Sequence, residues 1–157
     1  MSKRIRRATI GDYDICYNFY SEMCKSQEEQ EYGKQVSSTV LIQDKVNAWI
    51  HEDDLYNVNL LYDGEELIGM CVMHHTTERA VLSYWHIGLF YILPQHRRKG
   101  YGYYFLKTIL DMYSVDNLDF TINVFAWNTP AIRLYEKCGF KPQSTKMKLE
   151  RAESNEL

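Results

Sequence analysis

The stretch PQHRRKGYGYYFLK, residues 94–107, contains the most informative local pattern of this chain. A proline ends an apolar run, three cations follow at 97–99, and Gly100 and Gly102 precede a run with helical spacing. A loop between a strand end and a helix start exposes unpaired N–H groups and the positive end of the helix dipole. Glycines let a ligand approach the backbone, so the loop predicts an anion site, most simply for phosphate.

Two other phosphate-binding patterns do not fit this loop. It lacks the G-K-S/T ending of a P-loop, and it lacks the G-x-G-x-x-G spacing of a dinucleotide-binding turn. A capped helix with a solvated basic edge is the alternative interpretation. The loop alone does not separate that alternative from an anion site.

On both sides of this loop, segments whose apolar residues have strand spacing are mixed with segments that have helix spacing. Asp12 is placed to cap the first helix, and Asp63-Gly64 is a strong hairpin signal. The polar segment 25–35 is expected to be a loop or an exposed helix edge. Strands are expected over 4–10, 57–63, 66–75, 80–93, 118–126 and 144–150, and helices over 12–25, 40–50, 101–113 and 129–139. This order predicts an α/β (α+β) fold, with a mixed central sheet and helices on both faces.

Length and composition are typical of a globular domain. The 157 residues predict a single domain over 1–157, with about 151–157 as a frayed tail. A net charge of −3 argues against broad nucleic-acid binding. Four scattered cysteines without C-x-x-C pairing are typical of reduced thiols in a cytoplasmic protein. Neither a signal peptide nor a membrane segment is expected.

A second motif, NTPAIRLYEKCGF at residues 128–140, follows an expected strand. Pro130 suits the first turn of a helix, and Gly139 suits the position just past its end. Together with R-x-x-G-x-G at Arg97–Gly102, this N-x-x-A-x-x-L-Y-E-K-x-G-F run resembles the GNAT-type N-acetyltransferase superfamily. The resemblance implies the GNAT acyl-CoA N-acyltransferase fold, a mostly antiparallel sheet of six to seven strands, and acetyl-CoA as cosubstrate.

The resemblance also implies roles for individual residues. The coenzyme A pyrophosphate would lie on the loop, and the pantetheine arm would pair with strand backbone near a bulge at Gly88. Tyr135 would protonate the leaving thiolate, as a phenol can when hydrogen bonded to a thiol of lower pKa. The structural alternatives are a core-edge aromatic for Tyr135 and a helix-start polar residue for Asn128. The implied cofactor-binding residues are Phe90, Tyr91, Ile92, Arg97, Arg98, Lys99, Gly100, Tyr101, Gly102 and Asn128.

The general base is the point at which the match fails. Asn123 stands where the ribosomal-protein alanine acetyltransferases of this superfamily carry a glutamate, and asparagine cannot accept a proton at working pH. His86 resembles a histidine of the arylalkylamine branch and could accept a proton near neutral pH. The alternative is a satisfied strand histidine. His74 and His75 could form a metal site with His86, but the two are neighbours on a strand and point to opposite faces, so no metal site is expected.

These observations predict a metal-free enzyme that moves acetyl from acetyl-CoA to a primary amine by direct attack. The acceptor would be a small molecule or a peptide amine, and the protein a monomer or homodimer without nucleic-acid or membrane partners. Glu28, Glu29 and Glu31 would border the acceptor side and favour a cationic amine, unless they form only a solvated helix edge. The alternatives from other classes are a non-catalytic acyl-CoA-binding or regulatory module and a plain phosphate or nucleic-acid binder.

Overall fold

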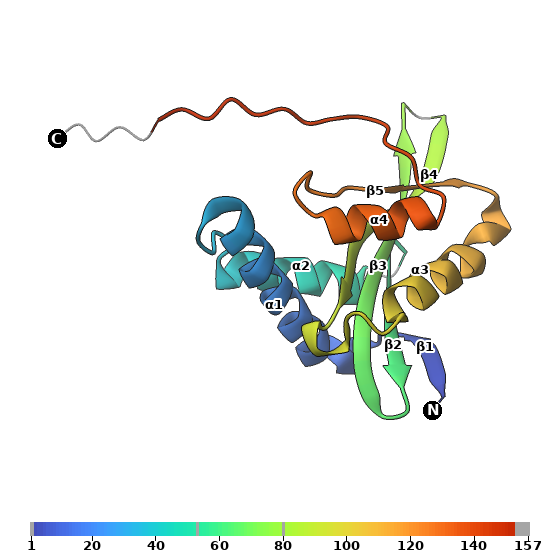
Figure 1. The fold of residues 1–157 in the computed structure, drawn as a ribbon. Coiled ribbons are helices and arrows are strands. Elements are labelled where there is room, and N and C mark those ends of the chain that lie inside the picture. Colours follow the sequence, from blue (N-terminus) through green and yellow to red (C-terminus); the bar gives the residue numbers. More distant parts are fainter. Residues whose placement is uncertain (1, 53, 80, 153–157) are drawn as a thin grey trace.

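The chain folds around one five-stranded sheet (Figure 1). The structure is a computed structural model, and it describes residues 2–52, 54–79 and 81–152. The strand order is β1-β2-β3-β4-β5. Neighbours from β1 to β4 are antiparallel, and β5 is parallel to β4. The predicted mixed, mostly antiparallel sheet is therefore confirmed. The strands are β1 (Lys3–Arg7), β2 (Tyr56–Asp63), β3 (Glu66–Glu78), β4 (Leu82–Ile92) and β5 (Asp119–Ile122).

Helices cover both faces of the sheet, as predicted (Figure 1). Because both faces are covered, consecutive strand residues can both be buried: Leu60 packs in the core under α1 and α2, while Leu61 packs in the core under α3 and α4. The helices are α1 (Tyr13–Tyr32), α2 (Thr39–His51), α3 (Tyr101–Met112) and α4 (Thr129–Lys137). Within the described ranges, no helix is long and apolar enough to cross a membrane.

The start and the length of α1 differ from the expectation. Asp12 does not cap the helix with its side chain; its carboxylate accepts two 2.8 Å hydrogen bonds from Arg6 and one from the Thr9 N–H. The helix continues through the polar segment after residue 25 and ends at Gly33, whose φ of 73° is in the left-handed region. The connection to α2 therefore begins later than the sequence pattern indicates.

The carboxyl-terminal part of the sheet is shorter than predicted. Residues 141–152 contain neither strand nor helix, so the prediction of a strand over 144–150 is wrong, and the sheet has five strands in the described residues instead of six to seven. Likewise β5 covers only Asp119–Ile122 of the expected 118–126. A strand needs a hydrogen-bonded neighbour, and the segment after α4 extends away from the sheet (Figure 1). The expected frayed tail falls mostly outside the described residues.

Candidate active site

The strand β4 contains a bulge at the point where its pairing with β5 ends. Val72 pairs with Leu89 and Met73 with Ile87, so Gly88 is an extra residue on β4, which confirms the predicted bulge. The pairing of β4 with β5 ends at the same point, at Ile87. Beyond the bulge, β4 keeps β3 on one side but has no strand on its other side in the part of the chain that is described. From Gly88 onward, this edge of the β4 backbone therefore has no strand partner and is open to a ligand as far as Tyr91.

The three residues predicted to face the pantetheine arm lie on this open part of β4. Phe90 packs against Phe105 and against the edge of Tyr135, on the α3 and α4 side. Tyr91 packs in the opposite core, and its buried hydroxyl has no partner among the described side chains. The Ile92 carbonyl already accepts a 2.9 Å hydrogen bond from Arg97 Nε. Because the side chains of Phe90 and Tyr91 pack into the two cores, the backbone is the part of this strand that suits an extended ligand.

The three cations of the loop do not share one role. Besides its bond to Ile92, the Arg97 guanidinium lies 4.9 Å from the centre of the Tyr91 ring, so this side chain fixes the loop to the end of β4. Arg98 and Lys99 are exposed, and neither forms an ion pair or a side-chain hydrogen bond within the described residues. Their charges remain available to an anion.

The start of α3 has the geometry of an anion site. Gly100 caps the helix with a φ of 84°, and a Cβ built on it meets no heavy atom within 4 Å. The first backbone bond of this helix runs from Tyr104 N–H to the Gly100 carbonyl. The N–H groups before it, from Tyr101 to Tyr103, therefore point out of the helix end. This cradle fits a pyrophosphate that approaches the backbone closely.

Tyr101 and Gly102 also have structural tasks that the sequence pattern did not reveal. The Tyr101 hydroxyl donates a 2.6 Å hydrogen bond to Asp63 in the β2–β3 hairpin. A Cβ on Gly102 would lie 3.2 Å from Leu134 Cδ2 and 3.9 Å from Ile92 Cγ1. The missing side chain of Gly102 thus allows close packing of α3 on α4. The backbone N–H groups of both residues lie in the first turn of α3, where they have no intrahelical acceptor.

The predicted residues of α4 lie at its start and in its core. Asn128 is the N-cap, and its Oδ1 is 3.4 Å from the Ala131 nitrogen. Tyr135 is buried about two turns later and contacts Phe90 and Phe140. Burial raises the pKa of the Tyr135 phenol, which therefore keeps its proton at physiological pH.

His86 lies in a row of polar and aromatic side chains on the α1 and α2 side of the sheet. Its Nδ1 is 2.7 Å from Thr121 Oγ1, and its ring centre is 5.4 Å from that of His74, which in turn contacts Tyr56. Burial lowers the pKa of both histidines, with a smaller contribution from their mutual repulsion in the case of His86. His86 is therefore a neutral imidazole near pH 7 and could accept a proton.

The β3–β4 register pairs His74 with His86, which spacing within a single strand does not specify. His75 points to the opposite face and packs against Trp85, as the strand pattern predicted. Across residues 2–52, 54–79 and 81–152, the structure contains no group of three His, Cys, Asp or Glu side chains that could hold a metal ion.

Two of the three glutamates expected to border the acceptor side, Glu28 and Glu31, accept hydrogen bonds from other parts of the chain. Glu28 is buried and accepts hydrogen bonds of 2.8–3.0 Å from the N–H groups of Val36 and Ser37, which fixes the connection to α2. Glu31 accepts a hydrogen bond from the Trp127 indole of the β5–α4 connection. Glu28 and Glu31 therefore accept hydrogen bonds within the fold, and of the three carboxylates only Glu29 is exposed without an ion pair or a side-chain hydrogen bond in the described part of the chain.

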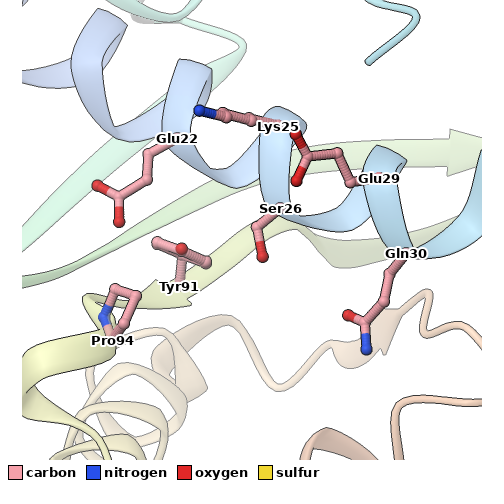
Figure 2. A pocket seen from close by; sticks show the side chains of 7 residues that line it. All are labelled: Glu22, Lys25, Ser26, Glu29, Gln30, Tyr91 and Pro94. Carbon is pink, nitrogen blue, oxygen red and sulfur yellow. The ribbon is translucent and has the colours of Figure 1, made fainter. Parts of the chain in front are cut away.

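Two open cavities border this region. One of about 450 Å³ lies between α1 and the end of β4, with Tyr91 and Pro94 facing the side chains of the helix (Figure 2). Its residues on α1 are Glu22, Lys25, Ser26, Glu29 and Gln30. A second, of about 240 Å³, is lined by α1, by the connection to α2 and by Phe125. Both cavities lie on the face of the sheet that carries His86.

Comparisons with known proteins agree with this geometry. The model of the Acetyltransferase (GNAT) family matches residues 16–140. A possible acetyltransferase from Clostridium difficile 630 is 16% identical, with a TM-score of 0.75 over 98% of this chain and 100% of that one. A predicted acetyltransferase with acetyl-CoA from Clostridium acetobutylicum is 12% identical, with a TM-score of 0.72 over 95% and 96%. AAC(6')-Iy, in complex with the bisubstrate analog CoA-S-monomethyl-acetylneamine, is 10% identical, with a TM-score of 0.71 over 97% and 99%.

The family match covers most of the chain. The chain therefore belongs to the GNAT acetyltransferase family, a family of acetyl-CoA-dependent N-acetyltransferases. At the identities of the solved structures, their likeness shows the fold. The comparison with curated proteins yields no match. The resemblance, the fold and the enzyme class expected from the two motifs are confirmed.

Proposed function

We propose that this chain transfers the acetyl group of acetyl-CoA to a primary amine by direct attack, without a metal. The observation that carries this proposal is the separation of β4 from β5 at the Gly88 bulge, next to the exposed N-terminus of α3. An extended thioester needs such a site, with open strand backbone for its arm and a cationic helix start for its phosphates.

The cofactor-binding roles follow the predicted residues. Backbone groups of Phe90 to Ile92 would pair with the pantetheine arm. The N–H groups of Gly100 to Gly102, with the charges of Arg98 and Lys99, would bind the pyrophosphate. Arg97 would act mainly by holding the loop in place, because its Nε already bonds to Ile92. Asn128 would offer its amide N–H₂, since its Oδ1 faces the first turn of α4.

Tyr135 is proposed as the general acid. Its ring contacts Phe90 on the open part of β4, so its side chain borders the path of the thioester. Because burial raises its pKa, the phenol is protonated throughout the working range and can donate to the departing thiolate. A backbone N–H of β4 beside the bulge would stabilise the negative charge that develops on the carbonyl oxygen.

His86 is proposed as the general base, or as the residue that holds a water in that role. Thr121 fixes its Nδ1 side, and a lowered pKa keeps the imidazole able to accept a proton. Tyr84, two residues earlier on β4, would help to hold a water. Asn123 is exposed just after β5 and has no basic group, so it is not proposed for this step.

Direct attack by the amine is favoured over a covalent cysteine intermediate. A thiolate is the nucleophilic form of cysteine, and burial raises the pKa of the thiols in this chain. For Cys16 the pKa rises to about 12, and Cys71 is fully buried. Cys138 is half-buried, and its pKa is also raised by burial.

A cationic amine, on a small molecule or a peptide, is the proposed acceptor. Glu22 and Glu29 both line the larger cavity and flank Lys25 along α1 (Figure 2). Carboxylates at a cleft raise the local concentration of cations. The relative crystallised with an acetylneamine analog supports a small amine of this kind.

A screen of amines with detection of free CoA tests the proposal. We expect CoA release with at least one cationic amine, and a thermal shift with acetyl-CoA but none with an oligonucleotide. A thermal shift with acetyl-CoA, but no CoA release with any amine, would replace the enzyme by the non-catalytic acyl-CoA-binding module. A shift with the oligonucleotide alone would favour a nucleic-acid binder.

A further inference from the structure

A second histidine lies beside the bulge of β4, on the neighbouring strand. The β3–β4 register pairs His74 directly with His86, and the centres of their rings are 5.4 Å apart. Directly paired residues on one face of a sheet have side chains in contact, so the two imidazoles form a unit. The function proposed above uses only His86 of this pair.

The His74 ring also reaches the bulge itself. A Cβ built on Gly88 would lie 4.0 Å from His74 Nδ1 and 3.8 Å from the Val72 carbonyl oxygen. Gly88 is exposed, and the pairing of β4 with β5 ends at the residue before it. A ligand atom at the position of that Cβ would therefore touch a ring nitrogen of His74.

The surroundings of His74 hold its ring in place and keep it neutral. The ring centre lies 5.5 Å from that of Tyr56 on β2. Burial lowers the pKa of His74, with smaller contributions from Lys45 of α2 and from His75, and no hydrogen bond contributes. A neutral imidazole has one nitrogen that accepts a hydrogen bond and one that donates, so the nitrogen beside Gly88 can be the acceptor.

We propose that His74 binds the acceptor amine at the bulge by accepting a hydrogen bond from its nitrogen, while His86 takes the proton. The inference rests on the proposed acetyl transfer and names a residue that holds the acceptor for it. Thr121 bonds to His86 at Nδ1, so Nε2 is the nitrogen of His86 that remains for the proton. A primary ammonium has three N–H groups and can donate to both imidazoles at once.

The protons of the step balance with these roles. The ammonium first gives one proton to His86 Nε2, and the freed lone pair of the amine forms the C–N bond as the C–S bond breaks. The thiolate takes a proton from Tyr135. The surplus proton on the new amide nitrogen replaces the Tyr135 proton through water, and His86 releases its own proton to solvent. His74 neither gains nor loses a proton, so it binds the acceptor and is not the base.

Two substitutions of His74 separate its nitrogen from its ring. His74→Phe keeps an aromatic ring against Tyr56 and His86 but has no nitrogen, whereas His74→Asn keeps a short side chain that accepts a hydrogen bond. The probe is whichever of putrescine, spermidine, neamine and trilysine gives the highest kcat/KM at saturating acetyl-CoA. We expect KM for this amine to rise about tenfold in His74→Phe, with kcat within a few-fold, and to stay within a few-fold of the parent in His74→Asn.

The pH profile is a second measurement. His86 has His74 beside it on β3 and Thr121 on β5, while Lys45 of α2 and Tyr56 of β2 act on the His74 side. After burial, repulsion by His74 is what lowers the His86 pKa. His74→Asn removes that repulsion, so the acidic limb of kcat/KM should move to higher pH, which a role in packing alone would not produce.

His75 supplies the matched control. It is the next residue of β3, it points to the opposite face, and its ring packs against Trp85. His75→Phe keeps an aromatic ring there and should have the amine KM and the acidic limb of the parent. Calorimetry should give the same affinity for acetyl-CoA in the parent and in all three variants.

NMR of the ring nitrogens tests the contact in the unaltered protein. With CoA bound, addition of the same amine should move the Nδ1 resonance of His74 and leave that of His75 in place. An unmoved His74 resonance, an unchanged amine KM in His74→Phe, or an equal rise of KM in His74→Phe and His74→Asn would each overturn this inference and leave acetyl transfer intact. A parent that releases no CoA with any of the four amines would overturn acetyl transfer, and this inference with it.

Discussion

Tyr135→Phe separates the proposed chemistry from folding. The substitution removes only the phenol oxygen and keeps the ring that packs against Phe90 and Phe140. Apolar side chains surround Tyr135, and no hydrogen bond contributes to the raised pKa of its hydroxyl. Its loss therefore leaves no buried partner without a hydrogen bond, and the free energy of unfolding should change by less than about 1 kcal/mol.

The expected kinetic effect is much larger. A lost general acid lowers turnover by about 10²–10⁴, which corresponds to roughly 2.7–5.5 kcal/mol of transition-state stabilisation. Because burial raises the pKa of Tyr135, the parent phenol stays protonated across the assay range, and the loss should be the same from acid to mildly alkaline pH. The affinity for acetyl-CoA should not change, since no binding group of the loop is altered.

Stopped-assay turnover, acetyl-CoA calorimetry and thermal unfolding measure these three quantities on one sample. Tyr17→Phe is the matched control, because it removes a hydroxyl from a tyrosine of α1 that lines neither cavity. It should behave as the parent in all three assays. If turnover of Tyr135→Phe on the preferred amine stays within a few-fold of the parent, then water or another group is the acid.

Three further substitutions test the base, the loop and the start of α1. For His86→Gln, the acidic limb of kcat/KM, expected below about pH 6.5 because burial lowers the His86 pKa, should vanish; an unchanged profile leaves His86 a structural residue. Gly100→Ala should weaken acetyl-CoA binding about tenfold, since its Cβ enters the open cradle, and should also lower the melting temperature, because a side chain at a φ of 84° is strained. Gly102→Ala should lower the melting temperature through Leu134 without that loss of affinity, and calorimetry that shows equal losses of affinity would reject the cradle. Asp12→Asn should cost about 1–2 kcal/mol at pH 7, less than the roughly 2.5 kcal/mol implied by a carboxyl pKa of about 2 against 3.8, because Arg6 is partly exposed. Since the Arg6 hydrogen bond lowers that pKa, this stability is present above about pH 4 and is lost toward pH 2, and a parent-like acid unfolding curve would contradict it.

Local signals predicted most of the fold. Asp63-Gly64 indicated the first hairpin, and β2 ends and β3 begins around it. Pro94 and Gly139 indicated where β4 and α4 end, and both ends were found within two residues. Such signals depend on the conformations that one residue allows, so they can be read without knowledge of the rest of the chain.

The failures depend on contacts between distant segments. The strand expected at 144–150 and the full length of the strand at 118–126 both need a neighbour on the same sheet edge, and sequence alternation does not say whether one chain supplies it. The pairing of His74 with His86 depends on the extra residue at Gly88, because a shift of one residue would move His74 to another partner. Spacing within one strand does not by itself show where a bulge shifts the register with its neighbour.

The charged residues show why a charge pattern alone does not define a binding site. Arg97 and Glu28 stand in runs of like charge that suggested ligand binding. Arg97 instead donates to the Ile92 carbonyl at the end of β4, and Glu28 accepts from N–H groups just before the start of α2. Such groups at strand and helix ends lack regular partners, and a nearby charged side chain satisfies them at little entropic cost. Neighbours of the same sign, such as Arg98, Lys99 and Glu29, then keep their charges exposed. When several like charges stand beside the end of a strand or helix, the side chains that bond to its backbone stabilise the fold. Only the other charges of the run are available to attract a phosphate or an amine.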